Sequence, residues 1–189
     1  MNVKHLLSSQ NILGEGPLWH EEEQVLYWVD ITGKSVNRMD PKTGKHEIFS
    51  VDSQVGVIAR REKGGFITAG AKGFGFWAPG QEKIAYLKDP EADKPDSRFN
   101  DGKVDRKGRF WAGTMTHQGA VSALYRMDAD LSIHRIERGL TISNGIGWNP
   151  DNRLMYFVDS LRYVIYQYDF DLSSGAVSNR RVFVQLGRD

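Results

Sequence analysis

Hydrophobic and polar residues alternate along this chain in short runs, separated by turns that contain Gly, Pro, Asn or Asp. In residues 163–170, for example, Val, Tyr or Phe occupies every second position. A period of two is typical of β-strands that are buried on one face. No segment of useful length shows the helical period, so the pattern predicts an all-β protein.

The strand-like runs repeat in a fixed order. Four segments each contain a Gly-bearing turn, a short apolar strand, a second turn and a second strand that often ends in Asp, followed by two further strand-like runs. Successive segments are about 40–46 residues apart, as in β-propeller blades. This favours a β-propeller of four-stranded blades over a meandering β-sandwich, which stays the alternative. The predicted first and second strands are 14–19 and 25–30, 55–59 and 65–69, 100–105 and 108–113, and 144–148 and 153–159.

Other stretches have simpler interpretations. Residues 89–97 are polar and Pro-rich and predict a loop, and residues 181–184 predict a last strand. Gly70–Gly75 superficially resembles a phosphate-binding loop, but no helical pattern follows it, so a β-turn is the better interpretation. The large aromatic residues fall on strand positions and are expected to pack between blades: Trp19, Trp28, Trp111, Trp148 and Tyr156.

Composition and charge narrow the function classes. The 189 residues suit one sizeable core better than two domains, and the formal charge of +1 gives no electrostatic argument for nucleic acid or an anionic membrane. The chain has no cysteine, which excludes disulfides, thiolate metal sites and a cysteine nucleophile. No apolar run reaches the roughly 18–20 residues of a membrane span, and the N-terminus lacks a signal-peptide layout. We therefore expect a cytoplasmic protein.

Oxygen-bearing side chains lie in or beside Gly-containing turns at the beginnings of three repeats: Glu15, Asn100 with Asp101, and Asn144. Carboxylate and amide oxygens are the ligands that hard cations such as Ca²⁺ prefer, whereas the five scattered histidines predict no zinc site. Each residue also has an ordinary structural interpretation. Asn-Gly and Asn-Asp-Gly are common turn sequences, and Arg98 could form a surface salt bridge.

Several motifs taken together resemble the regucalcin (senescence marker protein)/gluconolactonase family. They keep the family's order over essentially the whole chain: Gly14-Glu15-Gly16-Pro17, Ser97-Arg98-Phe99-Asn100-Asp101-Gly102-Lys103, Gly113-Thr114-Met115, Ile142-Ser143-Asn144-Gly145 and Tyr156-Phe157-Val158-Asp159-Ser160. The resemblance implies a six-bladed propeller, of which residues 1–189 form about four blades as a single, truncated domain. It also implies an enzyme that hydrolyses sugar lactones such as gluconolactone, with calcium as the expected cofactor and zinc or manganese as alternatives.

The resemblance also assigns roles to residues. Glu15 and Asn144 correspond to metal ligands, and Arg98, Asn100 and Asp101 correspond to substrate-binding residues. Because the first strands of propeller blades converge on one axis, Glu15 and Asn144 are expected to share one cation. In that arrangement the metal polarises the lactone carbonyl and activates the attacking water.

The chain departs from the family pattern in two places. The usual third ligand, an Asp in a Pro-Asp-Gly segment, would lie beyond Asp189, so no catalytic base is assigned. Thr116-His117-Gln118 stands where the family has an acid that contacts substrate. Residues 3–12, which in such propellers pair with the last blade, are expected to lack a strand partner.

Two questions about partners and function stay open at this point. A sugar lactone is the expected small-molecule partner, while open strand edges of a partial ring favour self-association or a complementing chain. The alternative function is a non-catalytic propeller fragment that binds calcium or another protein. Residues 26–31 also resemble the YWTD repeat of extracellular ligand-binding propellers, although the absence of cysteine argues against a secreted module.

Overall fold

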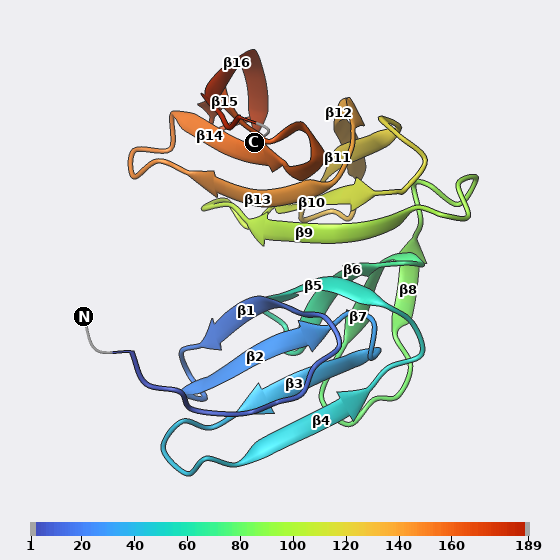
Figure 1. Ribbon diagram of the computed structural model, residues 1–189, viewed down its shortest axis with the longest axis vertical. Coiled ribbons are helices and arrows are strands. Elements are labelled where there is room, and N and C mark those ends of the chain that lie inside the picture. The colour runs from blue at the N-terminus through green and yellow to red at the C-terminus, as the bar shows by residue number, and fades with distance from the viewer. Residues whose placement is uncertain (1–2, 188–189) are drawn as a thin grey trace. The chain divides into compact units, whose positions relative to one another are not determined.

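The computed structural model describes residues 3–187, and β-strands dominate it. These residues contain sixteen strands and one 3-10 helix, η1 (Ser160–Arg162). The strands form four antiparallel sheets of four strands each, in which every strand pairs with its neighbour in the sequence (Figure 1). The all-β prediction is confirmed, and a four-stranded meander is the blade unit of a β-propeller. None of the described residues forms a helix long and apolar enough to cross a membrane.

The chain divides into two compact units, with the boundary between Lys88 and Asp89, and each unit contains two sheets. The first sheet of the first unit contains β1 (Gly14–His20), β2 (Val25–Asp30), β3 (Ser35–Met39) and β4 (His46–Ser50). Its second sheet contains β5 (Val55–Arg60), β6 (Phe66–Gly70), β7 (Gly73–Trp77) and β8 (Ala85–Lys88).

The second unit has the same organisation. Its first sheet contains β9 (Arg98–Val104), β10 (Phe110–Met115), β11 (Ser122–Met127) and β12 (Ile133–Leu140). Its second sheet contains β13 (Ser143–Trp148), β14 (Leu154–Asp159), β15 (Val164–Asp171) and β16 (Ala176–Gln185).

The predicted strands agree closely with these bounds, and residues 89–97 form a loop as expected. The β-turn prediction for Gly70–Gly75 is correct only for Ala71 and Lys72, because Gly73 to Gly75 already belong to β7. Gly75 is needed there for packing, since a Cβ on it would lie 2.4 Å from Ile84 Cγ2. The last strand spans 176–185 and is longer than the predicted 181–184. The prediction missed its first half because that half is largely polar and exposed.

In some strands, such as β2, β14 and β15, alternate side chains are buried in the core, whereas β6, β10 and β11 are buried along their whole length. In β2, Val25, Tyr27 and Val29 are buried, and the Tyr27 ring lies 4.8 Å from that of Phe66 in the neighbouring sheet. In the second unit, Trp111 of β10 is fully buried. Its ring centroid lies 5.9 Å from that of Trp148 on β13. Each buried aromatic side chain contributes about 1.5–3 kcal/mol of hydrophobic stabilisation.

The prediction that aromatic residues pack between blades is confirmed for Trp111 and Trp148 and wrong for Trp19. The Trp19 side chain is 46% exposed. Trp28 stacks on His46 of its own sheet, with ring centroids 5.2 Å apart. Tyr156 contacts Phe183, also within one sheet. Strand periodicity therefore showed which side chains share one face of a strand. It did not show which of the two faces packs against a neighbouring sheet.

Candidate functional site

The first strand of every sheet contains a register shift at a corresponding place. The shift follows Glu15 in β1, Val55 in β5 and Asn144 in β13, and it lies at Asn100–Asp101 in β9. These positions are 40 to 45 residues apart, which is the predicted repeat. β-Bulges redirect side chains and are common beside functional sites. Three of the four repeats therefore present a polar, oxygen-bearing side chain at the same point of the blade.

Two buried aspartates fix the chain just before these bulges. Asp30, at the end of β2, accepts hydrogen bonds from the backbone amides of Ile12 and Leu13, both at 3.0 Å. Asp159, at the end of β14, accepts hydrogen bonds from the backbone amide of Thr141 at 3.2 Å and from that of Ile142 at 3.3 Å. The recurring Asp of the sequence pattern thus anchors the segment that leads to Glu15 in one sheet and to Asn144 in another.

In the second unit, β9 and β13 lie side by side and bring four of the predicted site residues together (Figure 1). Arg98 Nη1 donates a hydrogen bond to Asn100 Oδ1 at 2.8 Å. Asn100 Nδ2 donates to the backbone carbonyl of Ser143 at 3.0 Å. All three side chains of Arg98, Asn100 and Asn144 are half-buried. A guanidinium, two carboxamides and a carboxylate therefore share one edge between two sheets.

Asp101 uses both of its carboxylate oxygens on backbone amides. Gly102 N donates to Oδ1 at 2.8 Å, and Gly145 N, on the neighbouring sheet, donates to Oδ2 at 2.8 Å. Hydrogen bonds to a charged acceptor are stronger than neutral ones. Asp101 thus connects β9 to β13.

The backbone at Asn144 requires its glycine neighbour. Gly145 has φ +46°, and a Cβ on it would lie 2.9 Å from Val158 Cγ2. The amide of Gly145 also lies 3.1 Å from Asn144 Oδ1. Asn144-Gly145, which as a sequence resembled an ordinary hairpin turn, therefore forms the β-bulge of strand β13.

Gly113 is a site-supporting residue whose role the motif alone did not reveal. A Cβ on Gly113 would lie 2.3 Å from the Cβ of Ser143, far inside an ordinary contact. The close approach of β10 and β13 therefore depends on the glycine of Gly113-Thr114-Met115. The Ser143 side chain is completely buried. The only sequence signal for this close contact was that the motifs containing Gly113 and Ser143 both have small residues.

The loop before Arg98 is fixed by a buried carboxylate, Glu91, which is 3% exposed. Lys94 Nζ donates to it at 2.8 Å, Tyr125 Oη donates at 3.0 Å, and Ser97 Oγ donates as well. Burial alone raises the pKa of Glu91, but the hydrogen bonds from Lys94, Ser97 and Tyr125 outweigh burial and leave the pKa below its ordinary value. Nothing in the sequence pattern of this polar loop pointed to Glu91.

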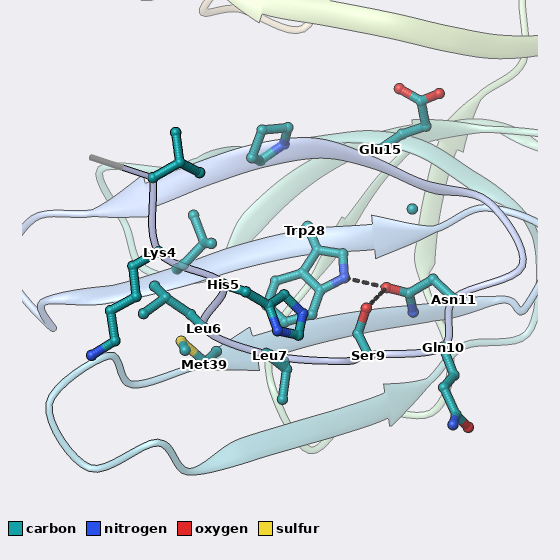
Figure 2. A pocket seen from close by; sticks show the side chains of 14 residues that line it. Lys4, His5, Leu6, Leu7, Ser9, Gln10, Asn11, Glu15, Trp28 and Met39 are labelled. Carbon is teal, nitrogen blue, oxygen red and sulfur yellow. Dashed lines mark hydrogen bonds between the residues drawn. The ribbon is translucent and has the colours of Figure 1, made fainter. Parts of the chain in front are cut away.

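Glu15 lies in the first unit and is exposed. It borders an open groove of about 820 Å³ between residues 3–11 and the first sheet. Figure 2 shows its carboxylate pointing away from Trp28 and Asn11, which face the groove and hydrogen-bond to each other at 2.7 Å. Residues 3–12 belong to no strand, as expected. They lie beside the first sheet, β1 to β4, and line the groove with it. The sharing of one cation by Glu15 and Asn144 stays a prediction.

Within residues 3–187, no group of three or more His, Asp or Glu side chains is arranged to hold a metal ion. Amide oxygens are among the further ligands that hard cations accept. The Asn144 oxygen lies 3.1 Å from the amide of Gly145, which Asp101 also binds, whereas the oxygen of Asn100 accepts a hydrogen bond from the positively charged Arg98.

The meandering four-stranded sheets with corresponding bulges in their first strands define a chain of β-propeller blades. Residues 13–189 match the family described as SMP-30/Gluconolactonase/LRE-like region, and the chain belongs to that family. Regucalcin of Xenopus laevis is 36% identical over 199 residues, covering 100% of this chain and 66% of the relative. Human regucalcin is 36% identical over 185 residues, covering 93% of this chain and 61% of the relative. The Bacillus subtilis protein YvrE, provisionally named a sugar lactone lactonase, is 36% identical over 170 residues, covering 89% and 58%.

Solved structures agree with this assignment. A luciferin-regenerating enzyme superposes with a TM-score of 0.85 at 28% identity, covering 93% of this chain and 61% of that protein. A calcium-binding regucalcin from Agrobacterium tumefaciens gives 0.88 at 22% identity, covering 94% and 61%, and shows the fold alone. The predicted fold class and family are confirmed. The chain spans less than two thirds of the length of these relatives.

Proposed function

We propose that this protein takes part in metal-dependent hydrolysis of sugar lactones, with the candidate site around Arg98, Asn100 and Asn144 at its centre. The observation that carries the proposal is the corresponding bulge in β1, β9 and β13, which gives Glu15, Asn100 and Asn144 related positions in three repeats. The Bacillus subtilis relative named as a sugar lactone lactonase supports the reaction class.

For the cofactor, we propose a divalent cation, with calcium as the first candidate. Asn144 would supply an amide oxygen and Glu15 a carboxylate, which are hard ligands of the kind that calcium prefers. When bound, the cation would polarise the lactone carbonyl and lower the pKa of a coordinated water molecule.

For the substrate, we propose that Arg98 and Asn100 bind the sugar. Arg98 Nη1 donates to Asn100 Oδ1 at 2.8 Å and to the carbonyl of Phe99 at 3.0 Å, which fixes the guanidinium. A guanidinium is a planar group of N–H donors, which suits recognition of sugar hydroxyl and carbonyl oxygens. A fixed cationic donor also stabilises the negative charge that develops on the lactone oxygen during hydrolysis. Asn100 is held in turn by the carbonyl of Ser143, so the pair is positioned before substrate arrives.

The experiment is an assay of gluconolactone hydrolysis by the 189-residue chain, with and without added calcium or zinc. We expect cation-stimulated hydrolysis, a loss of roughly tenfold or more in cation affinity for Glu15→Gln and Asn144→Ala, and a raised KM for Arg98→Lys. Even the loss of a partner outside the first coordination shell commonly costs about 10–100-fold in affinity. Lysine lacks the planar fork of arginine, so the Arg98 variant should affect substrate more than cation.

A matched control is Glu22→Gln, because Glu22 is an exposed carboxylate in the turn after β1 and pairs with Arg60 at 2.6 Å. It should keep wild-type cation affinity. Calcium binding without any lactone hydrolysis would favour the non-catalytic alternative. Equal behaviour of Glu15→Gln and Glu22→Gln would remove Glu15 from the proposed ligand set.

A further inference from the structure

Two hydrogen bonds between β9 side chains and the backbone of β13 lie on either side of Asn144. Asn100 Nδ2 binds the carbonyl of Ser143, the residue before Asn144, at 3.0 Å. Asp101 Oδ2 accepts from the amide of Gly145, the residue after it, at 2.8 Å. The peptide groups on both sides of Asn144 are therefore held by the neighbouring sheet.

The amide of Gly145 has two competing acceptors. It lies 2.8 Å from Asp101 Oδ2 and 3.1 Å from Asn144 Oδ1. The aspartate is both nearer and charged, so it takes the larger share of this hydrogen bond. Without Asp101, the same N–H would turn to the Asn144 carboxamide and bind its oxygen more closely.

We propose that Asp101 is a positioning residue for Asn144 and not a sugar contact. By holding the Gly145 amide, Asp101 keeps the carboxamide oxygen of Asn144 available to bind a cation. This inference rests on the proposed function for the identity of that ligand. It differs from the substrate-binding role that the sequence resemblance assigned to Asp101. Both oxygens of the carboxylate already accept backbone hydrogen bonds, from Gly102 and from Gly145.

The test is Asp101→Asn, which preserves size but leaves one acceptor oxygen for two backbone donors. Its NH₂ group must then face either Gly102 N or Gly145 N. We expect calcium affinity, measured by titration calorimetry with calcium alone, to fall roughly tenfold to a hundredfold, the scale of a lost hydrogen bond to a charged group. In NMR spectra recorded without calcium, we expect both the Gly145 backbone amide signal and the Asn144 side-chain amide signals to shift, because the Gly145 N–H changes its acceptor.

The control is Asp40→Asn. One oxygen of Asp40 also accepts a backbone amide, Lys42 N at 2.8 Å, but in an exposed turn of the first unit. It should leave calcium affinity and the Asn144 signals unchanged.

The outcomes separate the two proposals. If Asp101→Asn leaves calcium affinity unchanged and raises only the KM for lactone, Asp101 contacts the sugar and the positioning role is wrong. If the Gly145 and Asn144 signals do not change, the positioning role is also wrong, whatever calcium does. A wild-type chain that binds no calcium refutes the proposed function, and the two NMR signals still decide whether Asp101 holds the Asn144 segment.

Discussion

Substituting alanine for Gly113 tests how strongly the candidate site depends on the close approach of two sheets. Gly113 lies in β10, and Ser143 lies at the beginning of β13, directly before Asn144. The added Cβ would lie 2.3 Å from Ser143 Cβ and 2.6 Å from Ser143 Oγ. A Cβ cannot rotate away from its own backbone, so one of the two strands has to move.

The expected magnitude follows from two opposing terms. Carbon atoms in contact normally lie about 3.5–4.0 Å apart, so the strands must separate by about 1 Å or more. Such overpacking typically costs about 1–3 kcal/mol. Replacing Gly by Ala also restricts the unfolded chain, which stabilises by about 0.4–1 kcal/mol. We therefore expect Gly113→Ala to lower the free energy of unfolding by about 1–2 kcal/mol.

The assay is urea unfolding of the full chain, combined with calcium titration. Gly147→Ala is the matched control, because Gly147 lies in β13, has no positive φ, and its added Cβ would meet no atom within 4 Å. It should be neutral or slightly stabilising. The double variant Gly113→Ala/Ser143→Gly removes the clash and should regain stability, whereas Ser143→Ala keeps the Cβ and should not rescue Gly113→Ala.

If Gly113→Ala and Gly147→Ala have the same stability, the two strands do not pack as closely as the structure shows. Rescue by Ser143→Ala would equally refute the reasoning, because the conflict would then lie with the hydroxyl group. We also expect Gly113→Ala to weaken calcium binding, since a shift of β13 carries Asn144 with it.

Two further predictions concern stability. Asp105→Ala should lower the free energy of unfolding, measured in urea, by about 3–5 kcal/mol. The fully buried Asp105 carboxylate pairs with Arg109 at 2.6 Å, so removing it leaves the buried Arg109 charge without this partner. A cost below about 1 kcal/mol would contradict this reasoning. Glu91 should make folding sensitive to acid: its pKa is lower in the folded chain than its ordinary value of 4.5, so its contribution is present above that pH and is lost as the pH falls below it. Urea unfolding from pH 6 down to pH 3 should show a shallower decline for Glu91→Gln than for the wild type, and parallel declines would exclude the effect.

The sequence by itself determined the strands and their repetition. Period-two alternation and Gly- or Asp-marked turns located β2 to the residue and the other first and second strands of the repeats within two residues at each end. These signals are local, because each depends on which face of a strand is apolar and which turn a short segment can make. Motif order likewise placed Glu15, Arg98, Asn100, Asp101 and Asn144 at the beginnings of repeats.

Only the tertiary structure decided what these residues touch. Gly113 and Ser143 are 30 positions apart in the sequence, and their contact depends on how closely two sheets approach each other. The hydrogen bond from the Gly145 amide to Asp101 likewise joins two strands of different sheets. A one-dimensional pattern gives the direction of a side chain relative to its own strand, but not the atoms that a neighbouring sheet places in front of it. For that reason the sequence resemblance could mark Asp101 as a candidate site residue, while its hydrogen-bond partners came from the fold.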